Sequence, residues 1–330
     1  MNNRNRILTG MKPTGQVHLG NYLGAIRPAV EMSHNENNEV ILLCPDWHGL
    51  TNKMDMLLPG SLTNSIIAVY LALGFNLKNN AIILQSDFPQ IQENAWYLAC
   101  ACSAGLLERS HAYKDALASG KEATSGLLFY PVLMASDIMT FDAQTVPVGK
   151  DQLQHLEYAS DMAKLFNNAV KKPVYLEPKP IIQNTPTLLG TDGRKMSKSY
   201  NNAVPLFSTK KELEKAVREI KTDSKGLDDP KNPDECLVYE LFKSFASQEA
   251  IAYMKERLEK GVGYGYGHAK KDFLGEHEKV FGAKKELFDH YLSSPNEIKN
   301  LLQDGYTRAI SYANKVTARA RNALGLKSYL

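Results

Sequence analysis

The stretch RILTGMKPTGQVHLGNYLG, residues 6–24, joins a short apolar run to the start of a helical pattern. The run from Arg6 to Thr9 is typical of a buried strand. Gly10, Gly15 and Gly20 follow it, and small residues at these places allow a tight turn and the close approach of a ligand. Free amides at the start of a helix favour anions. This glycine turn, residues 10–20, therefore predicts a phosphate-binding connection between a strand and a helix.

Further short apolar runs occur at Val40 to Cys44, Ala81 to Gln85 and Thr145 to Val148, and longer helical patterns separate them. Such alternation predicts an α/β fold in which helices cover both faces of a parallel sheet. Ligands of these sheets bind beyond the carboxyl ends of the strands. The loops that follow the four runs are therefore the expected place of a binding site.

The second part of the chain is different, because charged amphipathic helices replace the strand-like runs. Thr209 and Glu212 form a capping box ahead of one such helix, and Gly325 is expected to end the last one. We therefore expect a larger domain over residues 1–200 and a smaller all-helical C-terminal domain over residues 201–330, with the last helix packing back on the first domain.

Composition places the chain among ordinary globular proteins, with 43% hydrophobic and 23% charged residues in a length of 330. A net charge of +3 permits a nucleic-acid partner without requiring one. The four cysteines, Cys44, Cys100, Cys102 and Cys236, lack zinc-site spacing, and we expect them to be buried thiols in a reducing compartment. No segment approaches the roughly 20 apolar residues of a membrane span. We expect a cytoplasmic protein.

A second unusual stretch, DGRKMSKS at residues 192–199, combines three cations with two hydroxyls after a glycine. This lysine loop is typical of a mobile lid. When a phosphoryl or nucleotidyl group is transferred, lysines that close over the departing pyrophosphate stabilise its charge in the transition state. Lys195 and Lys198 are therefore candidate catalytic residues. His18 and Asn21 join them, because their spacing of three lets both point donors at one anionic group.

These two stretches resemble the signatures of one family. The sequence His18-Leu19-Gly20-Asn21 is similar to the HIGH motif of class I aminoacyl-tRNA synthetases, and residues 195–199 match their KMSKS motif in all five letters. The resemblance implies a Rossmann-like catalytic domain in which an amino-acid carboxylate attacks the α-phosphorus of ATP and the acyl group then passes to tRNA. It also implies a homodimer, with Mg²⁺ carried mainly by the ATP phosphates, and it assigns anticodon binding to the helical domain.

The middle of the chain indicates which amino acid such an enzyme would use. Residues 127–138, LLFYPVLMASDI, and residues 146–157, VPVGKDQLQHLE, resemble two blocks of the tryptophanyl branch. Tyr130, Met134 and Asp137 share one helical face. Met134 supplies a polarizable wall for an aromatic ring, and Asp137 supplies an acceptor for the single N–H donor of an indole. The resemblance thus implies that L-tryptophan is the substrate and tRNA(Trp) the partner.

The remaining site residues are assigned by the resemblance. It implies that Tyr130 and Gln152 hold the polar ends of tryptophan, that Val146 and Val148 line its ring, and that His48 borders the indole. It implies an ATP site formed by Lys12, Pro13, Thr14, Gly20, Asn21, Gly149, Lys150, Asp151, Thr185, Lys195, Met196, Ser197, Lys198 and Ser199. Lys12 and Lys150 depart from the commoner Gln and Glu of the family, which leaves details of ATP and metal handling open.

Three alternatives stay open at this point. A tyrosyl-tRNA synthetase would keep the architecture and change only the pocket, although several such enzymes carry a glutamine where Met134 stands. A different nucleotidyl transferase would not need a tRNA-binding domain. A silent relative would keep the fold as an RNA-binding module. The cations Arg308, Lys315, Arg319 and Arg321 are either a track for RNA phosphates or a solvated helix face.

Overall fold

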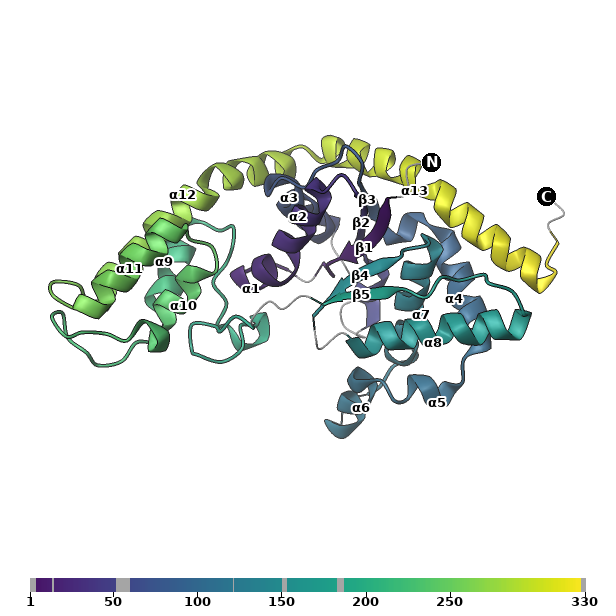
Figure 1. Ribbon diagram of the computed structural model, residues 1–330, viewed down its shortest axis with the longest axis horizontal. Coiled ribbons are helices and arrows are strands. Elements are labelled where there is room, and N and C mark those ends of the chain that lie inside the picture. The colour runs from purple at the N-terminus through teal and green to yellow at the C-terminus, as the bar shows by residue number, and fades with distance from the viewer. Residues whose placement is uncertain are drawn as a thin grey trace.

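The computed structural model describes residues 4–13, 15–51, 60–120, 122–149, 153–182 and 187–327. A parallel five-stranded sheet lies at its centre, in the order β3-β2-β1-β4-β5 (Figure 1). The strands are β1 (Asn5–Gly10), β2 (Asn38–Cys44), β3 (Ala81–Leu84), β4 (Thr145–Val148) and β5 (Lys179–Ile182). The predicted α/β fold with a parallel sheet is confirmed, and the four predicted runs form the first four strands.

The fifth strand was not predicted. Strand β5 lies at the edge of the sheet beside β4, and it contains Pro180. Its side chains are mostly exposed. An edge strand does not have to be apolar on both faces and it tolerates proline, so the short run with Lys179 and Pro180 before two isoleucines lacks the apolar pattern of a buried strand.

Helices cover both faces of the sheet. Helices α1, α2 and α3 lie on one side of it, and α4, α7 and α8 lie on the other (Figure 1). Successive side chains of β2 enter different cores, because Val40 and Leu42 point to the first side while Ile41 and Leu43 point to the second. The helices are α1 (Leu19–Asn21), α2 (Arg27–His34), α3 (Gly60–Ala72), α4 (Pro89–Ala101), α5 (Ala104–Leu107), α6 (His111–Ala118), α7 (Ser125–Thr140) and α8 (Leu153–Val170).

The C-terminal part is helical, as predicted. Helices α9, α10 and α11 gather at one end of the molecule, and α12 runs from there to the sheet (Figure 1). The predicted capping box of Thr209 and Glu212 begins α9, and Gly325 in the left-handed region ends α13. Within the described residues no helix is both long and apolar enough to cross a membrane. The helices are α9 (Lys210–Arg218), α10 (Leu237–Lys243), α11 (Gln248–Lys260), α12 (Tyr266–Ser293) and α13 (Pro295–Leu324).

The last helix packs on the sheet domain. Helix α13 contacts β3, α4 and α7. A Cβ atom at Gly305 would lie 1.9 Å from the Ile82 carbonyl oxygen, so the close approach of α13 to β3 requires glycine. Ala309, Ala313 and Val316 continue the contact into the core on the α4 side.

Two of the arginines on α13 hold this helix in place. Arg319 Nη2 lies 2.5 Å from Asp142 Oδ1, and Arg321 Nη2 donates to Glu93 Oε2 at 2.7 Å. These two guanidinium groups are therefore ion-paired within the protein, and a role of this face as a track for RNA phosphates stays a prediction. The acids that pair with them lie about 180 to 230 residues away in sequence, and a helical pattern gives no sign of such partners.

All four cysteines are free thiols, but they are not all buried. Cys44 and Cys236 are buried as predicted, whereas Cys102 is half-buried and Cys100 is exposed. The prediction for Cys100 was wrong because it lies on the outer face of α4, one turn after Trp96, whose surface is 66% exposed. The pattern was ambiguous there, because Trp96 and Cys100 are apolar and share the exposed face of α4 with the polar Gln92.

Candidate active site

One large cavity lies where the strand order reverses, at the carboxyl ends of β1 and β4. Its volume is about 1160 Å³. The described part of its lining comes from the ends of β1, β2 and β4, the glycine turn, the inner face of α7 and the lysine loop. Among the predicted site residues, those that line it are Lys12, His18, Gly20, Asn21, His48, Tyr130, Met134, Asp137, Val146, Val148, Gly149, Lys195, Met196, Ser197, Lys198 and Ser199.

The remaining predicted residues fall into two groups. Pro13 is buried and is not part of the described lining. Thr14, Lys150, Asp151, Gln152 and Thr185 lie outside the described residues. The structure thus brings together sixteen of the predicted side chains and backbone positions, from segments spread between residues 12 and 199.

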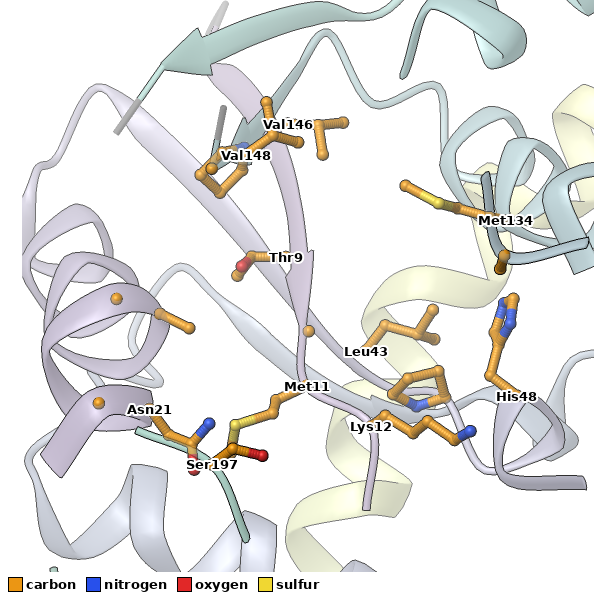
Figure 2. Close-up of a pocket in the computed structure, with 18 of the residues that line it drawn as sticks. Thr9, Met11, Lys12, Asn21, Leu43, His48, Met134, Val146, Val148 and Ser197 are labelled. Atoms are coloured by element: carbon orange, nitrogen blue, oxygen red, sulfur yellow. The ribbon is translucent and has the colours of Figure 1, made fainter. Parts of the chain in front are cut away.

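The cavity has two chemically different ends (Figure 2). His48 and Met134 lie on one side of it, and Asn21 and Ser197 lie on the other. Val146 and Val148, from β4, lie at the top of the view, above Thr9. We call the side of His48 and Met134 the amino-acid end and the side of Asn21 and Ser197 the phosphate end.

The glycine turn shapes the phosphate end. A Cβ atom at Gly10 would lie 2.2 Å from the Leu43 carbonyl oxygen, so β1 and β2 can end side by side only with glycine there. The chain then enters α1, where His18 Nδ1 accepts a hydrogen bond from the Asn21 amide at 3.3 Å. In return the His18 amide donates to Asn21 Oδ1 at 3.2 Å. A single π-helical turn (Tyr22–Ile26), a feature frequent at functional sites, leads on to α2.

The side chain of His18 is a neutral donor at physiological pH. Burial, together with the positive charge of Lys198, lowers its pKa to about 4. Because Nδ1 accepts from the Asn21 amide, the ring proton resides on Nε2. His18 lines the cavity, so its Nε2–H is available for an anionic oxygen there. The Asn21 side chain uses its oxygen in the capping box and keeps its amide NH₂ as a donor.

The lysine loop closes the phosphate end from the other side. It forms a short hairpin in which the Met196 amide donates to the Leu188 carbonyl at 3.0 Å. The segment after it runs beside the glycine turn, since the Leu19 amide donates to the Val204 carbonyl at 3.0 Å. The ammonium group of Lys198 lies 4.0 Å from the position that a Cβ atom at Gly15 would take. The two signature stretches, about 180 residues apart, therefore meet across the cavity.

Asn202 anchors the base of the lysine loop. It is buried, its Nδ2 donates to Asp192 Oδ1 at 2.7 Å, and its Oδ1 accepts from the Ser197 amide at 2.8 Å. Gly190 makes room for it, because a Cβ atom there would lie 2.3 Å from the Asn202 side chain. These bonds, with that from Arg194, hold the pKa of Asp192 well below its usual range. Sequence reasoning missed Asn202, which has no distinguishing pattern.

At the amino-acid end a carboxylate is buried and already hydrogen-bonded. Asp137 on α7 is 4% exposed. Gln85 Nε2 donates to its Oδ1 at 2.7 Å, and His48 Nε2 lies 3.0 Å from its Oδ2. Burial raises the pKa of Asp137, and the hydrogen bonds from His48 and Gln85 oppose that shift. Each oxygen retains a lone pair for a further donor.

Tyr130 also lies at the amino-acid end, where it forms a hydrogen-bonded pair with His155. Its hydroxyl lies 2.6 Å from His155 Nε2 on α8, and burial raises the pKa of the phenol. Sequence reasoning missed both Gln85 and His155 as parts of the site. Gln85 carried a usable signal, because it is a polar residue that ends an apolar strand at the edge where ligands are expected.

The charged side chains that line the cavity are mostly positive. Lys195 and Lys198 line the phosphate end, Lys12 reaches toward the side of His48 (Figure 2), and among the described residues Asp137 is the one carboxylate in the lining. No group of three or more His, Cys, Asp or Glu side chains that could hold a metal ion occurs in the described part of the chain. The phosphate end therefore offers cations and N–H donors to an anion.

Comparisons with known proteins agree with this geometry. A family model described as "tRNA synthetases class I (W and Y)" matches residues 1–282. The tryptophan–tRNA ligase of Pseudomonas aeruginosa is 39% identical, over 98% of this chain and 74% of that protein, and the one of Neisseria meningitidis is 36% identical over 98% of both. The crystal structure of the Campylobacter jejuni tryptophanyl-tRNA synthetase complexed with ADP and tryptophan has a TM-score of 0.90 at 36% identity, covering 97% of this chain and all of that one. The chain belongs to the class I tRNA synthetases and, within them, to the tryptophan–tRNA ligases.

Proposed function

We propose that this chain joins L-tryptophan to tRNA(Trp) in two steps within the one cavity. A tryptophan carboxylate oxygen attacks the α-phosphorus of ATP, the bond from that phosphorus to the bridging oxygen breaks, and pyrophosphate leaves. A hydroxyl at the 3′ end of the tRNA then attacks the carbonyl of the adenylate, and AMP leaves. The observation that carries this proposal is that Asp137 and the lysine loop face one cavity from opposite ends.

The amino-acid end recognises the indole. Asp137 accepts the indole N–H, Met134, Val146 and Val148 line the ring, and His48 borders it. Phenylalanine lacks the N–H and would leave the buried Asp137 acceptor without its third partner, at a cost of about 1–3 kcal/mol or more. Tyr130 and Gln152 hold the ammonium and carboxylate ends of the substrate.

Tyrosine is the sharper competitor, because a phenol O–H can also donate to Asp137. A phenol oxygen needs a further polar partner when it is buried, and Met134 supplies only a weak sulfur acceptor. A tyrosyl-tRNA synthetase is therefore the less supported alternative.

The phosphate end binds ATP and stabilises the charge that develops on it. His18 Nε2–H and the Asn21 amide donate to phosphate oxygens, and Lys195 and Lys198 neutralise the departing pyrophosphate. Positioning and fixed charge carry the rate, so no covalent enzyme intermediate is needed. The other contributors are Lys12, Pro13, Thr14, Gly20, Gly149, Lys150, Asp151, Thr185, Met196, Ser197 and Ser199.

Magnesium enters as part of the substrate. With cations rather than carboxylates at the phosphate end, the described residues offer Mg²⁺ no ligand cage of their own. The ion therefore arrives on the ATP phosphates, which supply its oxygen ligands.

The larger assembly is part of the same proposal. Residues 1–200 form the catalytic domain, residues 201–330 bind the anticodon of the tRNA, and the enzyme works as a homodimer in the cytoplasm. Trp96, exposed on the outer face of α4 together with Cys100, is an apolar surface that a second copy would cover.

The test is exchange of labelled pyrophosphate into ATP in the presence of Mg²⁺ and either tryptophan or tyrosine. Exchange with tryptophan, its loss in Asp137→Ala, and charging of tRNA(Trp) by the wild type would support the proposal. Exchange with tyrosine alone would overturn the substrate assignment, and no exchange with either amino acid would overturn the activity.

A further inference from the structure

Gln85 is a buried amide that lies outside the described lining of the cavity and donates a hydrogen bond to Asp137. It follows β3 as the first residue of a short 3₁₀ turn (Gln85–Asp87), and its exposed fraction is 0%. Its side chain is bonded at both ends: Oε1 accepts from the Trp47 amide at 3.0 Å, and Nε2 donates to Asp137 Oδ1 at 2.7 Å. Gln85 thus connects the backbone after β2 to the carboxylate on α7.

The backbone bond fixes which way the Gln85 amide faces. A main-chain N–H can only donate, so the Trp47 amide requires an oxygen opposite it. The NH₂ group must then face Asp137, because the reverse orientation would set the amide oxygen against a carboxylate oxygen. Gln85 is therefore a donor of fixed direction to one oxygen of Asp137.

The second oxygen of Asp137 is held independently. His48, from the 3₁₀ turn after β2 (Trp47–Thr51), lies 3.0 Å from Oδ2. With one partner on each oxygen the carboxyl group cannot rotate about its bond without losing both contacts. The two hydrogen bonds, one to each oxygen, determine where the remaining lone pairs of the Asp137 carboxylate point.

We propose that Gln85 is a positioning residue for tryptophan binding: its amide, held by the Trp47 backbone, orients the Asp137 carboxylate toward the cavity. This inference rests on the proposed function, in which Asp137 accepts the indole N–H. It extends that function by naming a residue that touches neither substrate and still sets the affinity for tryptophan. ATP binds at the far end of the cavity, so its affinity does not depend on Gln85.

Two substitutions of Gln85 distinguish a role in orienting the Asp137 carboxylate from a role in packing alone. Gln85→Leu keeps the approximate size and removes the donor at every pH. Gln85→Glu keeps an oxygen for the Trp47 amide and sets a second carboxyl group against Asp137. Two carboxyl groups at this distance share one proton, and the protonated form restores an O–H donor to Asp137. Above the apparent pKa of the pair both groups ionise, repel each other and lose that donor.

The expected results follow from this chemistry. Gln85→Leu raises the KM for tryptophan in pyrophosphate exchange about tenfold at every pH, as expected for a lost donor to a charged group. Gln85→Glu behaves like the wild type at low pH, and its KM for tryptophan rises as the pH increases. The KM for ATP stays within about twofold of the wild type in both variants. The wild-type value at each pH is the reference, and the other ionisable side chains near the pair are His48, Asp46 and Asp87.

The control is Gln90→Glu on α4, where the amide donates to Asn314 Oδ1 at 2.7 Å and lies outside the cavity lining. Its kinetics should match the wild type at every pH. A thermal unfolding curve for each variant checks that the variant is folded at the assay temperature.

The inference fails if Gln85→Leu leaves the KM for tryptophan within about twofold of the wild type, or if Gln85→Glu shows no pH dependence of its own. A parallel rise in both KM values would also overturn it, because that result indicates a general structural role. If the wild type shows no tryptophan-dependent exchange, the proposed function and this inference fall together. Wild-type exchange with unaltered variants overturns this inference alone.

Discussion

The two ends of the cavity hold their charges in opposite ways. At the amino-acid end Asp137 is buried, and Gln85 and His48 fix both of its oxygens before any substrate arrives. At the phosphate end Lys195 and Lys198 are exposed on a loop that is held by Asn202 and by the bond from the Met196 amide to the Leu188 carbonyl. A fixed buried acceptor suits recognition of a neutral ring, and exposed cations on a loop suit a charge that appears only in the transition state. We therefore expect the amino-acid end to set the affinity for tryptophan and the phosphate end to set the rate of the reaction.

The largest effect should come from the lysine loop. Lys198→Met should lower kcat for pyrophosphate exchange roughly 100- to 1000-fold, because a preorganised charge near the leaving group is lost. The KM for tryptophan should stay within about twofold, since the amino-acid end is untouched. Lys210→Met, at the exposed start of α9, is the matched control and should behave as the wild type. A large rise in the KM for tryptophan in Lys198→Met would contradict the separate roles of the two ends.

The next effect is at the amino-acid end. Asp137→Asn should raise the KM for tryptophan roughly 10- to 100-fold, the loss expected for a hydrogen bond to a charged acceptor. Its kcat at saturating tryptophan should change much less than that of Lys198→Met. Steady-state exchange kinetics measure both constants. If kcat falls and KM does not, Asp137 acts on the reaction rather than on recognition.

Asn202→Asp tests the anchoring of the lysine loop. The change replaces a donor to Asp192 by a carboxylate oxygen 2.7 Å from its Oδ1, so the loop should lose its fixed geometry. We expect kcat to fall about tenfold with the KM for tryptophan unaltered, because misplaced catalytic groups cost rate. Asn201→Asp, next to it and exposed, keeps the loop bonds and serves as the control. Equal kinetics of the two variants would show that Asn202 does not position the loop.

The smallest effect concerns the protonation of His18. Because its pKa is about 4, the ring stays neutral from about pH 6 to about pH 8, and Nε2–H remains the donor. The ratio of the KM for ATP in His18→Gln to that in the wild type should therefore change less than about twofold over this range. A ratio that grows as the pH falls through about 6.5 would mean that His18 binds phosphate as a cation.

The sequence predicted those parts of the site that lie within one local pattern. The glycine turn, the lysine loop and the shared face of Tyr130, Met134 and Asp137 follow from residue type and spacing over at most a few helical turns. The parallel sheet also followed, because the four predicted runs are short, largely buried and separated by helical patterns. Each of these patterns is local in the sequence. The glycine turn, the lysine loop and the face of α7 meet at the cavity where the strand order reverses.

The parts that could not be predicted depend on contacts between distant segments. Gln85 meets Asp137 across 52 residues of sequence, and Arg319 meets Asp142 across 177. Neither pair forms a pattern along the chain, because the fold alone brings the partners together. The exposed Cys100 and the edge strand β5 were missed for a related reason, since their exposure depends on which neighbours cover them.

Whether the two ends act separately is tested most directly by equilibrium binding of tryptophan in the absence of ATP. Isothermal titration calorimetry of the wild type, Asp137→Asn and Lys198→Met gives the three dissociation constants. We predict that Asp137→Asn weakens binding roughly 10- to 100-fold and that Lys198→Met stays within about twofold of the wild type. Equal weakening in both variants, or none in Asp137→Asn, would contradict the division of the cavity into an end for affinity and an end for rate.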